Sequence, residues 1–229
     1  MIIDQYGINC YDENDRGKEI VFFLGGKLEI KSKFYEIINE PNNIIKCPSL
    51  IDYDKEIEML QRFNDIRKNV KKTDLPSGYY QEKNIIRGEV IPYYMDAPTL
   101  FDLSIDKDKS KINNYYYKSD DKIRNLFILY NEILDIIEEL YDNNIDYYDS
   151  NSTNFVFKDN NVHLIDFDYK HISYKNNRKS LYKVLIGIDD LVDRMNNRFL
   201  AHDEFIYFPR SFNSMRKHLV KLENRIRKG

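Results

Sequence analysis

The chain has 229 residues, of which 42% are hydrophobic, and its 35 Lys and Arg against 38 Asp and Glu give a net charge of −3. This composition fits one large or two small globular domains and argues against wholesale disorder. The sequence contains no run of about 18 uncharged apolar residues and no N-terminal basic flank before a long apolar stretch, so neither a membrane span nor a secretory signal is expected. Two cysteines cannot make a disulfide framework, and a slightly acidic charge gives no general reason to bind nucleic acid. We therefore expect a cytoplasmic protein without nucleic acid as a partner.

Short strands interrupted by one helix are predicted for the N-terminal half of the chain. The expected strands cover residues 20–24, 33–39, 44–47, 79–85 and 89–94. Pro41-Asn42-Asn43 is a strong turn signal after the second strand. The last two strands are expected to connect through Arg87-Gly88.

The helix predicted in this half runs over residues 52–69. At about 100° per residue, one side of the helical wheel collects the apolar side chains of Met59, Leu60, Phe63, Ile66 and, just past the helix, Val70. Glu56 falls inside that apolar arc. A buried carboxylate is costly without a partner, so Glu56 requires a cation or a donor across the interface.

Helices and one hairpin are predicted for the C-terminal half. Residues 106–121 read as a charged loop or frayed helix, and residues 122–143 as a helix with one apolar half. A Lys-Asp-Asn-Asn turn between two apolar runs indicates a hairpin over residues 155–165. Further helices are expected near 179–196 and 211–227. The basic residues of the last helix are expected on its solvated face, the alternative being contact with an acidic partner, a membrane surface or nucleic acid.

Three polar side chains are expected to gather at the open end of this hairpin. Asn154 lies at its entry, Asp166 at its exit, and Asp149 five residues before Asn154. A hairpin returns its two ends to the same place, so Asn154 and Asp166 should lie close together. An amide oxygen and a carboxylate can hold Mg²⁺, and Asp149 could accept a proton from a hydroxyl. The alternative is that Asp149 and Asn154 are ordinary turn residues.

The stretch NNIDYYDSNSTNFVFKDNNVHLIDFD, residues 143–168, resembles the catalytic and metal loops of the protein-kinase-like superfamily. The His-Arg-Asp-x4-Asn motif is represented by Tyr147-Tyr148-Asp149 through Asn154, and the Asp-Phe-Gly motif by Asp166-Phe167-Asp168. In the N-terminal half, residues 44–46 resemble the Ala-Ile-Lys strand, residues 56–60 the helix carrying the paired Glu, and residues 93–100 the hinge. The resemblance spans roughly residues 20–195.

The resemblance implies an α+β, bilobal, protein-kinase-like fold. Its N-lobe, residues 1–95, would hold an antiparallel sheet with one helix at 52–69. Its C-lobe, residues 96–229, would be mostly helical and would carry the catalytic and metal loops at 147–168.

The same resemblance implies ATP and Mg²⁺ as cofactors, with Mn²⁺ as an alternative metal. Lys46 would hold the α- and β-phosphates and would be fixed by Glu56, while Asp149 would orient the acceptor hydroxyl. The metal ligands would be Asn154, Asp166 and Asp168. The remaining nucleotide contacts would come from Ser32 at the phosphate loop and from Tyr93, Tyr94 and Met95 at the hinge.

The sequence departs from the superfamily pattern at several positions. Gly25-Gly26 lie too early for the glycine-rich loop, and Lys31-Ser32-Lys33 occupy its expected tip. Tyr148 replaces the Arg that receives an activation-loop phosphate, so control of that kind is not expected. Asp168 replaces a Gly and is either a further metal ligand or a solvated loop residue. The usual peptide-substrate platform is reduced or absent.

Three functions remain open at this point. The first is a Ser/Thr protein kinase that acts on a protein substrate with Asp149 as the catalytic base. The second is a kinase of a small hydroxylated molecule such as an aminoglycoside, choline-like compound or sugar, which Asp168 favours. The third is a nucleotide-binding pseudokinase, which the eroded phosphate loop favours. The oligomeric state cannot be predicted from the sequence.

Overall fold

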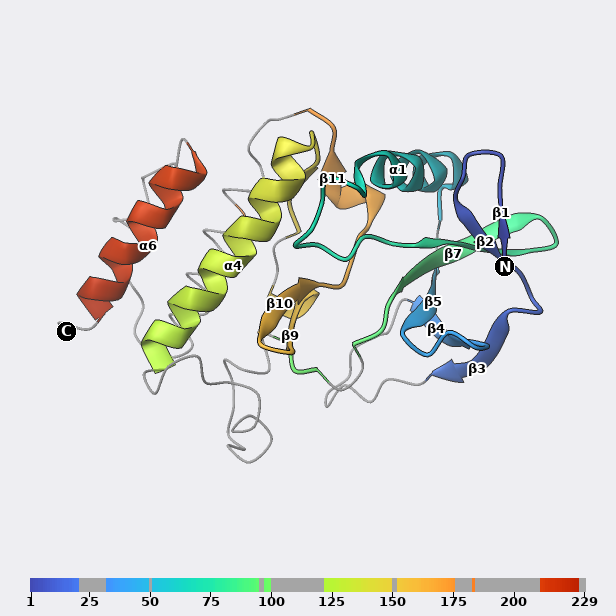
Figure 1. Ribbon diagram of the computed structural model, residues 1–229, viewed down its shortest axis with the longest axis horizontal. Helices are drawn as coiled ribbons and strands as arrows, with labels where there is room; N and C mark the ends of the chain where they lie inside the picture. The colour runs from blue at the N-terminus through green and yellow to red at the C-terminus, as the bar shows by residue number, and fades with distance from the viewer. Residues whose placement is uncertain are drawn as a thin grey trace. The chain divides into compact units, whose positions relative to one another are not determined.

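The computed structural model describes residues 1–20, 32–49, 51–94, 97–99, 122–149, 152–175, 183 and 211–226 (Figure 1). The chain divides into two compact units, Met1–Met95 and Asp96–Gly229. Both units contain helices and strands, so the predicted mixture of α and β structure is confirmed. The identity of the units as kinase lobes stays a prediction.

The first unit is built on one curled sheet of seven strands. Along the sheet the strand order is β1-β2-β6-β7-β5-β4-β3. The strands are β1 (Ile2–Ile3), β2 (Asn9–Tyr11), β3 (Arg16–Ile20), β4 (Ser32–Ile37), β5 (Asn43–Pro48), β6 (Gly78–Glu82) and β7 (Ile85–Pro92). All neighbours are antiparallel except β2 and β6, which run parallel.

The predicted strands at 33–39 and 44–47 are confirmed as β4 and β5. The strand predicted at 20–24 lies almost wholly outside the described residues, since β3 ends at Ile20. The expectation of a purely antiparallel sheet was wrong, because β2 adds to the edge of β6 in parallel. Strands β1 and β2 were not predicted, since each is too short to show a period-two pattern.

The predicted connection at Arg87-Gly88 was also wrong. The chain reverses at Lys83 and Asn84, whose φ angles of 50° and 63° suit a tight hairpin turn. Gly88 instead lies inside β7, where a Cβ atom would come within 2.1 Å of the carbonyl oxygen of Lys46 on β5. The glycine therefore permits a close approach of two strands rather than a turn.

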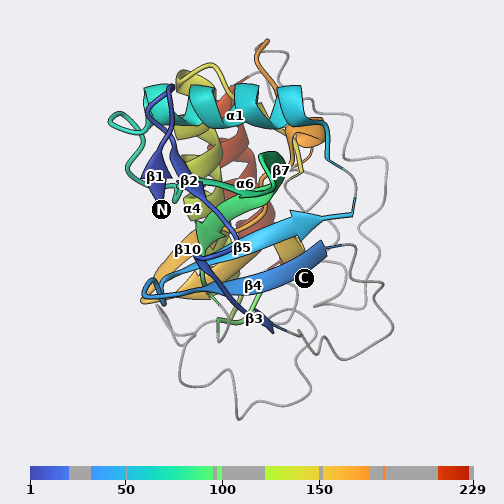
Figure 2. The same cartoon turned by 90° about the vertical axis from the view of Figure 1, so that its right-hand side faces the viewer.

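The predicted helix is confirmed as α1 (Tyr53–Ile66), which lies across one face of the sheet (Figure 2). Asp52 caps it by accepting a hydrogen bond from the backbone N–H of Lys55 at 3.4 Å. Met59, Leu60 and Phe63 are buried, and Glu56 is only 5% exposed. The inward position of Glu56 on the wheel is thus confirmed.

Two apolar clusters stabilise this unit. One contains Leu60 of α1 with Ile8, Cys10 and Tyr79, and the other contains Tyr11, Ile37, Ile45, Tyr80 and Val90. Neighbouring residues of one strand belong to different clusters because successive side chains point to opposite faces of a sheet.

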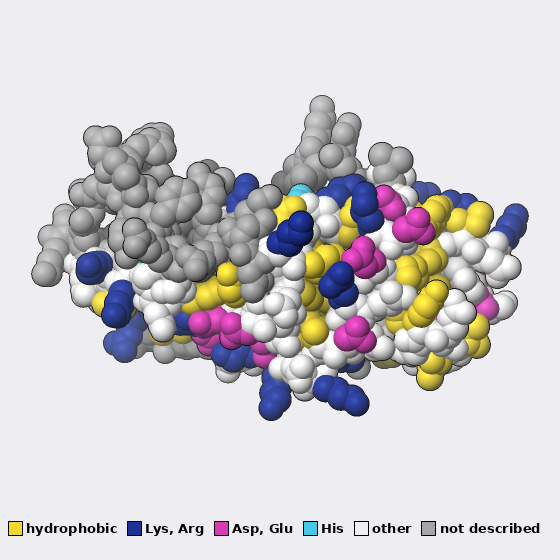
Figure 3. Space-filling model, turned by 90° about the horizontal axis from the view of Figure 1, so that it is seen from above, with side chains coloured by type: hydrophobic (Ala, Val, Ile, Leu, Met, Phe, Trp, Pro, Cys, Tyr) yellow, Lys and Arg dark blue, Asp and Glu magenta, His cyan; other side chains and the backbone are white. Residues whose placement is uncertain are grey.

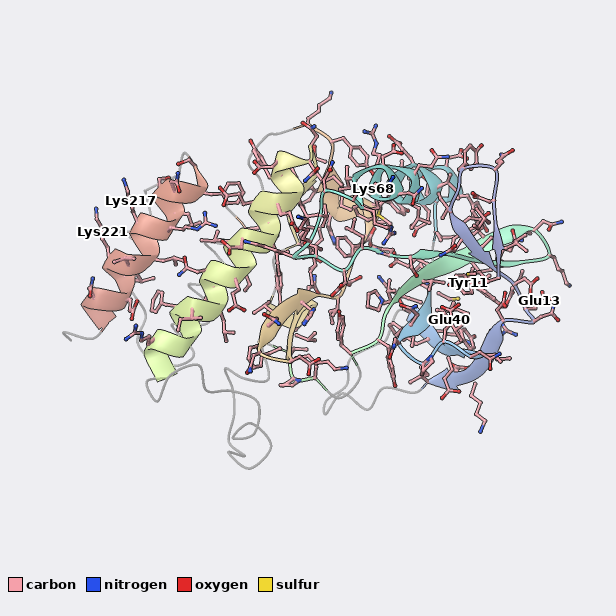
Figure 4. All side chains as sticks on the ribbon, in the orientation of Figure 1. Tyr11, Glu13, Glu40, Lys68, Lys217 and Lys221 are labelled. Carbon is pink, nitrogen blue, oxygen red and sulfur yellow. The ribbon has the colours of Figure 1, made fainter. Side chains whose placement is uncertain are left out.

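The hydroxyl of Tyr11 donates to the carboxylate of Glu40, at 3.0 Å from Oε2 (Figure 4).

The second unit begins, in its described part, with the long helix α4 (Lys122–Asp142). Further along the chain come β8 (Asp146–Tyr147), η1 (Ser152–Asn154), β9 (Phe155–Lys158), β10 (Asn161–Leu164), η2 (Tyr169–His171), β11 (Ile172–Ser173) and α6 (Phe212–Ile226). These elements confirm the predicted long helix, hairpin and last helix. The segments predicted at 106–121 and 179–196 lie outside the described residues, apart from Lys183.

The expectation that residues 96–229 are mostly helical was wrong for the part that the structure describes. Besides the predicted hairpin, the chain forms a second small sheet in which β8 and β11 pair antiparallel. Strands β8 and β11 lie before and after the hairpin in the chain, and they satisfy their backbone hydrogen bonds by pairing with each other. The local sequence pattern does not indicate this pairing, because it joins residues far apart in the chain.

Helices α4 and α6 pack side by side (Figure 1). The buried side of α6 carries Phe212, Met215, Leu219 and Leu222. Tyr141 of α4 meets Phe212 edge-on at 5.5 Å between ring centroids, and Arg216 pairs with Asp135 and, at 2.8 Å, with Glu138. Lys217 and Lys221 are exposed and point away from α4 (Figure 4).

No helix formed by the described residues combines the length and the apolar character needed to cross a lipid bilayer.

Candidate functional site

The hairpin formed by β9 and β10 brings the entry and exit of the predicted motif together. Asp159 and Asn160 form its turn with φ angles of 51° and 63°, and Phe155 pairs with Leu164 at its open end. The backbone N–H of Ile165 donates to the carbonyl of Asn154 at 2.9 Å. Asn154 and Asp166 are therefore held next to one another, as the hairpin argument predicted.

Asp149 and Asn154 are in direct contact. The side-chain nitrogen of Asn154 donates to Asp149 Oδ2 at 2.9 Å and to the Asp149 carbonyl at 3.0 Å. Asn154 is 7% exposed, and the Asp149 side chain is 30% exposed. The carboxylate is thus anchored from one side and reachable by solvent from another.

Tyr147 lies at the centre of this group and was not expected to contribute to it. Its ring is fully buried and packs against Phe167 at 5.8 Å between centroids. The hydroxyl lies 2.9 Å from the carbonyl oxygen of Asp166, 3.1 Å from that of Asp149, and 3.3 Å from the amide nitrogen of Asn154. One phenol therefore ties together the two loops that carry the predicted site residues.

The environment of Tyr147 keeps it neutral. Burial raises the pKa of the Tyr147 phenol well above its usual value, and the negative charges of Asp166, Asp149 and, more weakly, Asp168 raise this pKa further. Three carboxylates thus act on one buried hydroxyl, and the phenol stays a hydrogen-bond donor at any physiological pH.

The donor set of Asn154 and Asp166 fits a magnesium ion. Since Asn154 turns its nitrogen toward Asp149, its oxygen is the atom left for a cation, and this oxygen faces the Thr153 hydroxyl at 3.4 Å. Amide and carboxylate oxygens are ligands that Mg²⁺ accepts, usually with waters and phosphates completing the shell. In the described part of the chain, no three or more His, Cys, Asp or Glu side chains gather with metal-binding geometry. Asn154 and Asp166 offer one amide and one carboxylate, so they do not make up such a group.

Asp168, predicted as a further metal ligand or a loop residue, caps the short helix η2. Its Oδ1 accepts a hydrogen bond from the backbone N–H of Lys170 at 2.9 Å, and its carbonyl accepts one from the N–H of His171 at 2.8 Å. The side chain of Asp168 thus stabilises the start of η2 by capping it. Its role as a metal ligand stays a prediction.

His171 is a further member of the group that sequence reasoning missed. Its Nδ1 lies 3.1 Å from Asp149 Oδ2. The pairing of Ile172 with Tyr147 in the β8–β11 sheet brings His171 to this place. No local signal in the sequence indicates this approach, because it depends on a non-local strand pair.

In the first unit, Lys46 forms an ion pair with Glu89. The Nζ–Oε1 distance is 3.0 Å, and the two side chains are 11% and 4% exposed. The residues lie directly opposite one another on β5 and β7. The predicted pairing of Lys46 with Glu56 stays a prediction, and Glu89 is a carboxylate partner of Lys46 that was not predicted.

The other residues predicted to contact the nucleotide belong to the first unit. Ser32 begins β4 and lines a surface pocket of about 420 Å³. The other residues lining this pocket are Lys33, Tyr35, Cys47, Pro48, Ser49, Glu82 and Arg87. The backbone N–H of Tyr93 donates to the carbonyl of Asn42 at 2.9 Å, the hydroxyl of Tyr94 bonds Asp74, and Met95 lies outside the described residues. Their roles in nucleotide binding stay predictions.

Cys47, which borders this pocket, has the character of a structural residue. Burial raises the pKa of its thiol to about 12, and the charge of Glu82 adds to the effect. A thiol of this kind is a poor nucleophile at neutral pH.

Charged side chains of both signs are interspersed over the described part of the face shown in Figure 3. Charge alone therefore marks no region of this face, and the site is defined by its hydrogen bonds.

No family model matches the chain, and no curated protein matches it with significant similarity.

Proposed function

We propose that the protein is an ATP-dependent phosphotransferase whose acceptor is a Ser or Thr hydroxyl of a protein. The observation that supports this most is the contact of Asp149 with Asn154 at the open end of a hairpin whose exit carries Asp166. A proton acceptor beside an amide oxygen and a second carboxylate is a combination suited to the phosphorylation of a hydroxyl.

The proposed reaction transfers the γ-phosphoryl group of ATP. A bond forms between the acceptor oxygen and the γ-phosphorus, and the bond from that phosphorus to the bridging oxygen breaks, with its electron pair staying on ADP. The acceptor proton goes to the carboxylate of Asp149. Asn154 and Asp166 would hold Mg²⁺, which supplies positive charge to the phosphates when bound. Lys46 would bind the α- and β-phosphates.

A kinase of a small hydroxylated molecule is the second candidate. It is favoured by the course of the chain after Asp168, where η2 and β11 follow at once and β11 pairs back with β8. This return gives the metal loop little room to extend before the chain is fixed again. Asp168 itself would be a further oxygen ligand in this reading.

Phosphoryl transfer from γ-labelled ATP tests the proposal. Purified protein with Mg²⁺ is incubated with a general protein acceptor and, separately, with a panel of aminoglycosides, choline and sugars. Transfer to protein supports the first candidate, and transfer to a small molecule supports the second. Asp149→Ala should abolish transfer, whereas Asp142→Ala, an exposed aspartate at the end of α4, should leave the rate unchanged.

A pseudokinase would give a different pattern. ATP with Mg²⁺ would raise the thermal unfolding midpoint while no acceptor receives phosphate, and Asp149→Ala would alter neither result. That outcome would overturn the proposed activity.

A further inference from the structure

We infer that His171 is a positioning residue that orients the carboxylate of Asp149 toward the acceptor. This inference rests on the proposed function, since it assigns His171 a task in the same site. Asp149 Oδ2 lies 2.9 Å from the amide nitrogen of Asn154 and 3.1 Å from His171 Nδ1. Two side chains from different elements therefore meet the same oxygen.

The two contacts leave the other carboxylate oxygen for the acceptor. Asn154 donates to Oδ2, and His171 also donates to it when Nδ1 carries the ring proton. In the part of the chain that the structure describes, no hydrogen bond reaches Asp149 Oδ1. A carboxylate whose one oxygen is held by two donors cannot rotate freely about its terminal bond, so Oδ1 keeps one direction.

The backbone of His171 is fixed from both sides. Its N–H donates to the carbonyl of Asp168 at 2.8 Å, and its carbonyl accepts the N–H of Tyr148 at 3.0 Å. The ring of Tyr148 meets the imidazole edge-on at 6.0 Å between centroids. The next residue, Ile172, pairs with Tyr147 in the β8–β11 sheet. The imidazole is thus presented to Asp149 by a strand pair, not by a loose loop.

The exposure of the pair indicates orientation rather than stability as its main effect. The side chains of His171 and Asp149 are 43% and 30% exposed. Pairs with this access to water contribute little to folding because solvent competes for both partners. Holding a proton acceptor in one direction, by contrast, affects the rate of a reaction at that acceptor directly.

The chemical consequence follows from the proposed transfer. As the acceptor oxygen bonds to the γ-phosphorus and ADP leaves with the electron pair, the acceptor proton passes to Asp149 Oδ1. Loss of His171 would let the carboxylate turn, so fewer bound acceptors would face Oδ1. We expect kcat to fall by about ten- to a hundredfold, with the KM for ATP unchanged.

Three variants at position 171 test the inference. His171→Asn keeps a donor near the position of Nδ1, His171→Gln moves it to the position of Nε2, and His171→Ala removes it. Steady-state phosphoryl transfer should show low kcat for the Gln and Ala variants and recovery to within about threefold of wild type for Asn. Lys170→Ala, an exposed neighbour, should match wild type.

A double variant distinguishes positioning from a structural effect. If His171 acts through Asp149, adding His171→Ala to Asp149→Asn should cause no further loss of rate. An active wild type with His171→Ala unchanged, or a further loss in the double variant, would overturn the role of His171 alone. A wild type without phosphoryl transfer would overturn the proposed function itself and this inference with it.

Discussion

Replacement of Tyr147 by Phe tests the hydrogen-bond centre of the second unit. The change removes one oxygen and keeps the ring, so the contact with Phe167 and the packing of the fully buried side chain should persist. The Asp149 carbonyl keeps its bond from Asn154 at 3.0 Å, but the carbonyl of Asp166 loses the donor at 2.9 Å. Removing a donor from a partly buried acceptor costs about 2 kcal/mol.

The assay is equilibrium unfolding in urea, monitored by tyrosine fluorescence and circular dichroism. The free energy of unfolding should fall by about 2 kcal/mol for Tyr147→Phe, because the hydroxyl that is removed belongs to a fully buried side chain. Tyr148→Phe is the matched control, since the hydroxyl of Tyr148 donates to the carbonyl of Lys170 in an exposed place where water can replace it. It should cost less than about 0.5 kcal/mol. Equal losses for the two variants would refute the central role of Tyr147.

Three further predictions concern other charged and titratable groups. Glu89→Gln should destabilise the protein by about 3 kcal/mol because it leaves the charge of Lys46, whose side chain is 11% exposed, with a weaker partner. The double variant Lys46→Met with Glu89→Leu should lose less stability than Lys46→Met and Glu89→Leu lose together as single variants, and additive losses in urea unfolding would contradict this. At pH 8 the alkylation of Cys47, measured by mass spectrometry, should be about a thousandfold slower than that of a free cysteine, because the pKa of the Cys47 thiol is raised to about 12. A rate like that of a small thiol would show that Cys47 is reactive and would contradict its structural role. Burial, and then the charge of Lys221, lowers the pKa of His218 below 6.5, so the stability that the neutral ring contributes is present above pH 6.5 and is lost as the pH falls through the lowered pKa. In urea unfolding between pH 7 and 5, His218→Gln should therefore flatten the decline in stability, and an unchanged slope would contradict this.

Features with a local cause could be predicted from the sequence. The hairpin of β9 and β10 depends on a polar turn between two apolar runs, and the turn residues Asp159 and Asn160 adopt the positive φ angles typical of a tight hairpin turn. The inward position of Glu56 followed from helical periodicity alone. In both cases residues within a few positions of one another decide the structure.

Features with a non-local cause could not be predicted. Gly88 was interpreted as a turn residue, but it is required by the carbonyl of Lys46 on a neighbouring strand. The contact of His171 with Asp149 depends on the pairing of β8 with β11, two strands of two residues each. Strands this short carry no period, so the sequence pattern had no means to indicate either the small sheet or the histidine that it positions.

The most direct test of the proposed activity is a single-turnover measurement with γ-labelled ATP, Mg²⁺ and excess enzyme in the presence of an acceptor. Wild-type protein should move the labelled phosphate to a hydroxyl, and Asp149→Asn, which keeps the size of the side chain and removes its basicity, should slow this step by at least about a hundredfold. If the wild-type protein moves no label to any acceptor, or if Asp149→Asn transfers as fast as wild type, Asp149 is not the base of a phosphotransferase.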